Sequence, residues 1–313
     1  MRTGAGGGWR VCRVAAITGL VAFVLLQQQA QPPPAQPAPP ATEVYLASFT
    51  YDIIPPVGPP KNISNNPGYD NQPSFLPDGS GLLFTSNRDG KQTDIYRYDL
   101  STGIRQLTRT PESEYSPVVT PDRKSFSVIR VEADGTQRLW RFDLDGSNPR
   151  LVLENVKPVG YHVWIDETRL ALFVLGAQGQ PNTLQVADTK TGKAEVIESG
   201  IGRSLLIRPD KGTVSFVHKP AGGHWVVKEF DPRSRAIQTL TETVDNNVSE
   251  DCAWQPGGRL LMASGTKVFV WVPGAANWVE IADLSTAGIG RITRLALSPR
   301  HPMKLALVAD APR

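Results

Sequence analysis

The sequence predicts an all-β fold, a six-bladed β-propeller of four-stranded antiparallel blades whose last blade is closed by the mature N-terminal strands. Three observations carry this prediction. A turn signal recurs about every 44 residues, strands of alternating polarity follow each turn, and the sixth unit stops early. A fixed period in this range is typical of repeat architectures, and four short strands per unit are typical of a propeller blade.

The recurring turn joins the first strand of each unit to the second. It falls at spacings of 44, 44, 44, 47 and 43 residues, at Pro77-Asp78, Pro121-Asp122, Ile165-Asp166, Pro209-Asp210, Pro256-Gly257 and Pro299-Arg300. Proline fixes φ, and an aspartate side chain accepts a hydrogen bond from the backbone two residues on, so both favour tight turns.

Two further strands follow in each of the first five units. The third strands alternate in period two, as half-buried strands should, and are expected at 95–99, 139–143, 184–188, 227–231 and 269–273. After a turn come the fourth strands, expected at 105–107, 150–153, 194–197, 236–240 and 279–282.

The sixth unit is incomplete at its C-terminal end. After Pro299 only one further strand, 303–309, precedes the last residues. The two missing strands match 43–49 and 60–64 near the other end of the propeller. We therefore expect the N-terminal strands to complete the sixth blade, which closes the ring and removes exposed sheet edges.

The N-terminal region reads as an export segment. Arg2, Arg10 and Arg13 precede the apolar run 14–26, a pattern typical of a secretory signal, while a spanning helix needs about 20 apolar residues. We assign 1–30 to a signal peptide or N-terminal membrane anchor, 31–41 to a proline-rich linker, and 42–313 to the propeller. The expected location is periplasmic or otherwise exported, tethered to the inner membrane through 14–26 if the segment is not cleaved.

Charge and cysteine content limit the partners and the covalent links of the protein. A net charge of +3 without a long basic run argues against a nucleic-acid partner. The two cysteines, Cys12 and Cys252, fall in the export segment and the propeller, so no internal disulfide is expected in the mature protein. Cys252 is interpreted as a buried packing residue.

The repeat resembles that of the TolB family of periplasmic translocation proteins. The likeness is carried by 69–79, Tyr-Asp-Asn-Gln-Pro-Ser-Phe-Leu-Pro-Asp-Gly, and by 94–99, Asp-Ile-Tyr-Arg-Tyr-Asp. The resemblance implies a propeller and an exported location, but not the Tol-system role, because TolB proteins carry an α/β domain that does not fit between 41 and 69. Similar repeats occur in prolyl-oligopeptidase-like peptidases, whose hydrolase domain is not found in this sequence.

No catalytic motif stands out. The sequence has no Gly-x-Ser-x-Gly elbow, no His-Glu-x-x-His pair and no phosphate-binding glycine loop, so we assign no catalytic residue and no cofactor. Some propeller lyases and lactonases hold a metal at the channel. Three or four converging ligands are needed for that, and the aligned first strands offer one nearby histidine, so no metal site is assigned.

The candidate ligand-binding residues come from the first strand of each unit, because these strands line the axis of a propeller. Aligning the units on their turns gives a polar ring of mixed charge at the channel mouth. Its members are Asp70, Gln72, Glu114, Ser116, Tyr161, His162, Ser204, Asp251 and Arg294.

These observations favour an exported, non-catalytic interaction module, a monomer that binds an envelope protein or peptide. Two alternatives stay open: a channel-mouth hydrolase or lyase acting on a sugar or lactone, and an accessory or sensor subunit of an envelope transport system. Whether the protein is an enzyme is not decided by its sequence.

Overall fold

The computed structural model describes residues 7–8, 40–50 and 56–310. The chain divides into Met1–Ala38, of which only Gly7 and Gly8 are described, and Pro39–Arg313. The export segment and most of the proline-rich linker therefore lie outside the described residues. No helix in the described part has the length and apolar character needed to cross a membrane.

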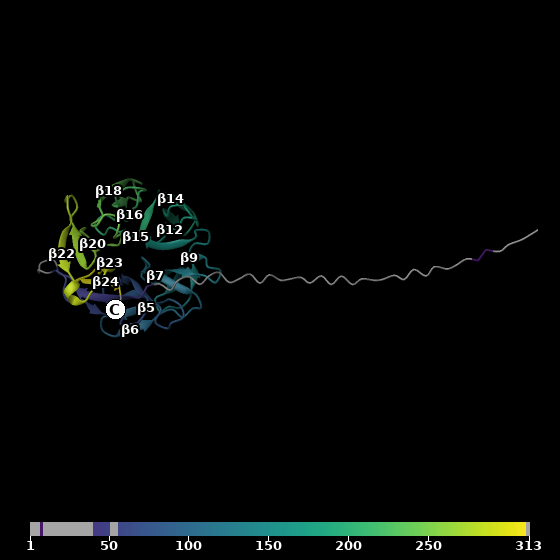
Figure 1. Cartoon of the computed structure of the whole chain (residues 1–313), viewed down its shortest axis with the longest axis horizontal. Helices are drawn as coiled ribbons and strands as arrows, with labels where there is room; N and C mark the ends of the chain where they lie inside the picture. The colour runs from purple at the N-terminus through teal and green to yellow at the C-terminus, as the bar shows by residue number, and fades with distance from the viewer. Residues whose placement is uncertain (1–6, 9–39, 51–55, 311–313) are drawn as a thin grey trace, which may run out of the picture. The chain divides into compact units, whose positions relative to one another are not determined.

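Within Pro39–Arg313, the described strands form six four-stranded antiparallel sheets arranged around an axis (Figure 1). This confirms the predicted six-bladed propeller. We number the blades in chain order, beginning with the sheet β3-β4-β5-β6; the sixth blade has the order β2-β1-β24-β23.

The first three blades run outward from the axis in chain order. Blade one holds β3 (Asp70–Phe75), β4 (Gly81–Ser86), β5 (Asp94–Asp99) and β6 (Gly103–Gln106). Blade two holds β7 (Ser113–Val119), β8 (Ser125–Val131), β9 (Gln137–Asp143) and β10 (Arg150–Leu151). Blade three holds β11 (Val159–Trp164), β12 (Arg169–Val174), β13 (Thr183–Asp188) and β14 (Ala194–Ser199).

The last three blades follow the same plan. Blade four holds β15 (Ile201–Ile207), β16 (Val214–His218), β17 (Val226–Phe230) and β18 (Ile237–Glu242). Blade five holds β19 (Cys252–Trp254), β20 (Leu260–Ser264), β21 (Lys267–Trp271) and β22 (Val279–Asp283), followed by the 3-10 turn η1 (Ser285–Ala287). Blade six holds β23 (Ile292–Leu297), β24 (Lys304–Asp310), β1 (Thr42–Ser48) and β2 (Lys61–Asn62).

The recurring Pro-Asp turns form as expected between the first and second strands. In blade one, the Asp78 carboxylate accepts a hydrogen bond from the backbone N–H of Ser80 at 3.0 Å, and Gly79 supplies the positive φ of 76° that the turn requires. Asp122 accepts the same bond from Lys124 at 3.0 Å. A local hydrogen bond thus precedes the second strand in blades one and two.

The hydrophobic core lies between the blades. The described residues form six clusters of buried side chains, and each cluster joins two neighbouring blades. In one of them, Leu83 and Ile95 of blade one pack against Phe126 and Phe142 of blade two. The second strands are covered on both faces, and every residue of β4 is buried. Burial on both faces favours apolar residues in these strands, such as Leu82, Leu83 and Phe84 of β4.

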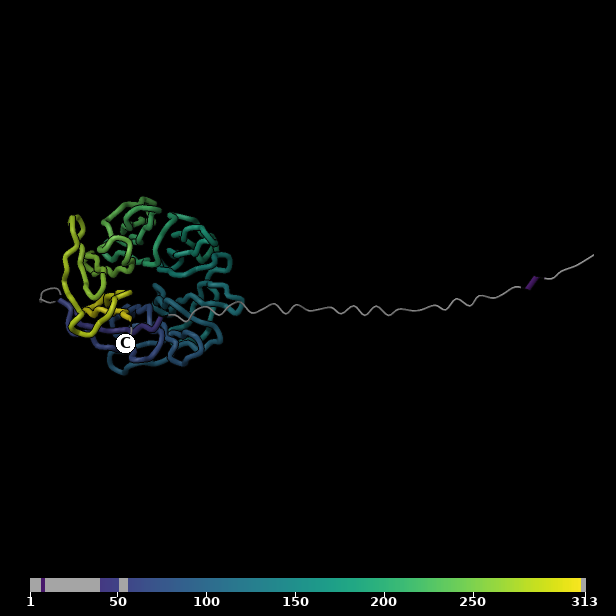
Figure 2. The backbone as a smooth tube through the Cα atoms, viewed as in Figure 1, coloured from purple at the N-terminus to yellow at the C-terminus, as the bar shows by residue number. Residues whose placement is uncertain are grey.

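The predicted closure of the ring is confirmed. β1 pairs with β24 over seven residues, from Thr42 opposite Asp310 to Ser48 opposite Lys304, and β2 pairs with β1. Figure 2 shows the start of the propeller chain beside its C-terminal strands. The buried Val44 and Val308 pack against Leu82 and Phe84 of blade one, so the joined blade also carries the sixth core cluster.

Candidate functional site

Cavities formed by the described residues lie along the axis between the innermost strands. One, of about 430 Å³, is at the N-terminal ends of these strands, and one of about 390 Å³ is at their C-terminal ends. A smaller cavity of about 150 Å³ lies between them. We call them the polar mouth (Tyr69, Tyr161, Arg203, Glu250, Asp251, Arg294), the apolar mouth (Phe75, Ile207, Pro209, Trp254, Leu297, Pro299) and the waist (Gln72, Ser116, His162, Ser204).

Asp251 holds two arginines together at the polar mouth. It lies just before β19, and its carboxylate accepts a hydrogen bond from Arg203 Nε at 2.9 Å and one from Arg294 Nη1 at 3.3 Å. Arg203 comes from β15 and Arg294 from β23, so this one carboxylate links the inner strands of blades four, five and six. Shared by two guanidinium groups, Asp251 neutralises only one of their two charges.

Two tyrosines form the facing wall of the polar mouth. The Tyr161 hydroxyl accepts a hydrogen bond from Arg294 Nη2 at 2.8 Å, and Arg294 Cζ lies 5.1 Å from the Tyr161 ring centre. The Tyr69 ring contacts that of Tyr115 edge to face, with centres 6.4 Å apart. Burial raises the pKa of the Tyr69 hydroxyl, so it stays a neutral donor at physiological pH.

A second carboxylate, Glu250, lies at the rim of the polar mouth. It accepts a hydrogen bond from the backbone N–H of Arg203 at 3.0 Å and pairs with Lys219 Nζ at 2.7 Å. Burial by itself would raise the pKa of Glu250, but the Lys219 hydrogen bond and the Arg203 charge hold it below its ordinary value. Lys219 also lies 3.8 Å from the Trp225 ring centre, which fixes the ammonium group at the rim.

At the waist, Gln72 bridges blades one and two. Its Oε1 accepts hydrogen bonds from the Thr85 hydroxyl at 2.8 Å and from the backbone N–H of Ser116 at 2.9 Å. Gln72 and Ser116 hold equivalent positions and both adopt positive φ, 58° and 53°. Ser116 Oγ is buried and has no hydrogen-bond partner among the described residues.

His162 is a buried, neutral imidazole beside the waist. Its Nε2 lies 2.6 Å from Ser127 Oγ, which also accepts from Trp164 Nε1 at 2.9 Å and lies 3.2 Å from the Val118 carbonyl. Because the Ser127 hydroxyl donates to Val118, it accepts from His162, so the proton is on Nε2 and Nδ1 is a lone-pair acceptor. Burial lowers the pKa of His162 to about 3, which keeps the ring uncharged.

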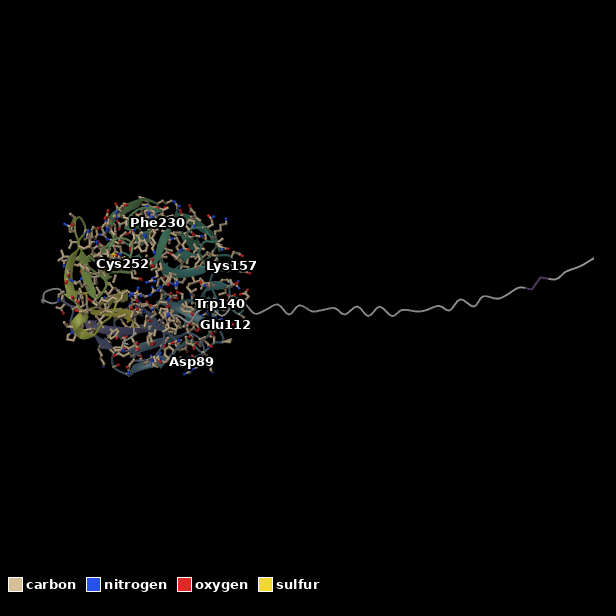
Figure 3. The ribbon with its side chains drawn as sticks, viewed as in Figure 1. Asp89, Glu112, Trp140, Lys157, Phe230 and Cys252 are labelled. Atoms are coloured by element: carbon tan, nitrogen blue, oxygen red, sulfur yellow. The ribbon has the colours of Figure 1, made fainter. Side chains whose placement is uncertain are left out.

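The same serine–tryptophan arrangement recurs between blades four and five. Trp254 Nε1 donates to Ser215 Oγ at 2.7 Å, as Trp164 does to Ser127. Cys252, two residues before Trp254, holds the place of His162 and is labelled on the inner strand in Figure 3. Its backbone N–H donates to Ser204 Oγ at 3.2 Å, and its thiol is buried, as expected for a packing residue.

Two of the predicted residues do not face the channel. Asp70 is fully buried and accepts from Asn66 Nδ2 at 3.0 Å, with Arg88 at 3.5 Å. The alignment assumed strict alternation along the inner strand, but the positive φ at Gln72 turns the backbone, so Asp70 points between the blades. The expectation that it faces the axis is therefore corrected.

Glu114, the second of these residues, also points away from the channel that the alignment predicted it to face. It is fully buried, accepts from Thr108 Oγ1 at 3.0 Å and pairs with Arg130 Nε at 3.2 Å. Arg130 Cζ lies 4.6 Å from the ring centre of Trp140, which Figure 3 labels together with Glu112, a further partner of Arg130. This carboxylate–cation–aromatic stack repeats the one made by Asp70, Arg88 and Tyr96, where Arg88 lies 5.0 Å from the ring centre.

The remaining seven predicted residues line the channel, but the alignment missed much of the polar mouth. Tyr69, Arg203, Glu250 and Lys219 were not predicted. Inner-strand pairing slips its register in five of the six blades, so residues adjacent to the aligned positions also reach the axis. The sequence could have pointed to two of these residues, because each lies next to an aligned position. Arg203 precedes Ser204, and Glu250 precedes Asp251.

No group of three or more His, Cys, Asp and Glu side chains in the described ranges is placed to hold a metal ion. What the polar mouth offers is a set of charged hydrogen-bond donors beside aromatic surface. Such a set can bind and orient an anionic group.

No protein-family model and no curated protein sequence matches this chain. Solved structures match its fold. A protein assigned as TolB from Agrobacterium tumefaciens is 15% identical with a TM-score of 0.67, over 87% of this chain and 100% of that one. TolB from Acinetobacter baumannii is 15% identical with a TM-score of 0.56, over 87% of this chain and 65% of that one.

The fold is also similar to that of a propeller enzyme. The gluconolactonase XC5397 from Xanthomonas campestris is 10% identical with a TM-score of 0.58, over 88% of this chain and 98% of that one. The propeller is therefore of the kind found in TolB structures, and this kind of fold carries more than one function.

Proposed function

We propose that this chain is an exported, non-catalytic propeller that binds a segment of an envelope protein or peptide at the polar mouth. The observation that carries the proposal is the cavity of about 430 Å³, where Arg203, Arg294 and Asp251 meet beside the tyrosine wall. The inner strands of blades one and three to six, or the residues just before them, supply these groups, so the site is organised before any ligand arrives.

The export part of the proposal rests on the N-terminal sequence, where arginines precede the apolar run 14–26. Cell fractionation tests it: the full chain should be recovered outside the cytoplasm, and a chain lacking 1–30 should stay inside. Recovery of the full chain in the cytoplasm would contradict export.

Site-specific photocrosslinking in cells tests the binding part. Val248 lines the polar mouth and its residue surface is 70% exposed, so a benzoylphenylalanine placed there should form a discrete adduct with a protein partner. Val279, on the outer strand β22, is 59% exposed and gives a matched control at the same kind of residue. Identical adducts at both positions, or no adduct at Val248, would contradict the proposal.

The enzyme alternative has its own support, in the likeness of fold to a gluconolactonase. Purified protein incubated with a panel of lactones and oligouronides should show no turnover under the interaction proposal. Turnover that is lost in Asp251→Asn would favour the channel-mouth enzyme instead.

A further inference from the structure

Counted together with Lys219, which lies at its rim on Glu250, the polar mouth carries one unbalanced positive charge. Its cations are Arg203, Arg294 and Lys219, and the carboxylates that face them are Glu250 and Asp251, which leaves a net charge of +1. The neighbouring Arg291 pairs with Asp310 at 3.4 Å and so does not change this balance. A partly enclosed site with an excess cation favours a monoanionic ligand.

The arginines keep donors available for such a ligand. Arg294 has five N–H groups and uses two of them on partners among the described residues, Asp251 and the Tyr161 hydroxyl. Arg203 Nη1 has no partner in that part of the chain, and the Arg203 side chain is 32% exposed. Both guanidinium groups can therefore donate to a second carboxylate, a geometry for which arginine is well suited.

Part of the cavity wall around the arginines is apolar or aromatic. Val248 projects from the loop between blades four and five with 70% of its surface exposed, and it lines the same cavity as Tyr69 and Tyr161. An exposed valine that lines the same cavity as two tyrosine rings can cover an apolar side chain that adjoins the bound carboxylate. A highly hydrated inorganic anion would leave this apolar surface without a partner.

We propose that the polar mouth recognises an acidic peptide segment, in which an aspartate or glutamate next to an apolar residue accepts hydrogen bonds from Arg203 and Arg294 through its carboxylate. This inference rests on the proposed function and names the chemistry of the partner. The carboxylate takes up the one positive charge that Glu250 and Asp251 leave unbalanced, and the neighbouring apolar side chain packs on Val248 and the tyrosine wall.

Selection from a phage-displayed random heptapeptide library tests the proposal on the purified mature chain. The enriched peptides should carry Asp or Glu beside an apolar residue. Each is then synthesised with the carboxylate replaced by its amide, and its dissociation constant is measured by fluorescence anisotropy. Loss of one charge-assisted contact should weaken binding by about tenfold or more.

Substitutions in the site are predicted to change peptide affinity in opposite directions. Arg294→Gln and Arg203→Gln should each weaken binding by about tenfold, whereas Asp251→Asn should strengthen it, since it releases both arginines. Arg150→Gln, on the short outer strand β10, is the matched control and should bind like the parent. Circular dichroism and thermal unfolding confirm that each variant is folded, and the opposite signs separate loss of the site from loss of the fold.

The outcomes separate this inference from the proposed function. Peptides that bind without an acidic residue, compete with crosslinking at Val248 and are insensitive to Arg294→Gln would overturn the acidic-peptide inference while leaving peptide binding in place. A library that yields no peptide for the folded protein would overturn both. Displacement of acidic peptides by galacturonate at equal concentration would show that a sugar acid is the ligand and would also overturn the inference.

Discussion

At the scale of residues, the buried charges of this propeller serve two different ends. Asp70 and Glu114 are enclosed between blades with an arginine and an aromatic ring, where they join neighbouring strands. Asp251 and Glu250 hold arginines that remain accessible from the channel. A carboxylate that is fully enclosed with its cation stabilises one arrangement of the chain, whereas a shared and accessible one leaves charge for a ligand.

Glu114 should make stability depend on pH. Burial raises the pKa of Glu114 from 4.5 to about 7, against the hydrogen bonds from Thr110 and Thr108 and the charge of Arg130. The folded protein therefore holds a proton on Glu114 that the unfolded chain releases, and stability falls as pH rises through this window. Glu114→Gln should remove this fall, worth up to about 3 kcal/mol, as measured by urea unfolding between pH 5 and 8.

The control for this prediction is a substitution of the other carboxylate that pairs with Arg130. Glu112 pairs with Arg130 at 3.4 Å and is partly exposed, so Glu112→Gln should keep the dependence of stability on pH. An unchanged slope in Glu114→Gln would assign the pH dependence to another group.

At the scale of elements, closure depends on a strand that is far from its partner in the chain. β1 pairs with β24 along its whole length and places Val44, fully buried, in the cluster between blades six and one. Without β1, the edge of β24 and one face of that cluster would be open to solvent. An unpaired edge of this length is prone to association with other chains.

A chain that begins at residue 67 should therefore aggregate or unfold at a lower temperature. A synthetic peptide covering 41–66 should restore the unfolding temperature, because it supplies β1 and β2 in trans. The same peptide carrying Val44→Asp should fail, since it would bury an unpaired charge beside Val308. Light scattering and thermal unfolding check both results, and a truncated chain with the parent unfolding temperature would contradict the closure.

At the scale of the whole ring, the blades are bound to their neighbours by comparable means. Each of the six core clusters joins two adjacent blades, so the packing is of nearest-neighbour type. The ring therefore has no structural first or last blade, and the place where the chain begins is a matter of connection. The channel is less even, because charged groups gather at one end and apolar and proline residues at the other.

This view predicts that the chain can be opened at another blade. Thr42 and Asp310 are paired across β1 and β24, so a short Gly-Ser linker can join them. New termini between Gly222 and Gly223, in the exposed turn between β16 and β17, would split blade four as blade six is split now. The permuted chain should unfold in one cooperative transition, with a free energy within about 2 kcal/mol of the parent.

Opening the chain inside β16, after the buried Phe216, is the comparison and should prevent folding, because it breaks a strand that is covered on both faces. If the permutant opened at Gly222 also fails, closure in blade six has a special role that the nearest-neighbour view does not include.

The sequence determined the number of blades, their turns and the closure of the ring. The reason is that these features are local or periodic: a Pro-Asp turn forms from neighbouring residues, an alternating strand reports its own half-burial, and a shortened sixth unit shows where its missing strands must come from. The burial of Cys252 followed from the same kind of reasoning.

Only the tertiary structure decided which side chains meet at the channel. Register slips and the positive φ values at Gln72 and Ser116 break the alternation that the alignment relied on, so Asp70 and Glu114 turn between the blades while Arg203 reaches the axis. A slip of one residue exchanges the two faces of a strand. The sharing of Asp251 by arginines of two other blades is equally long-range, and it could be seen only once the ring was closed.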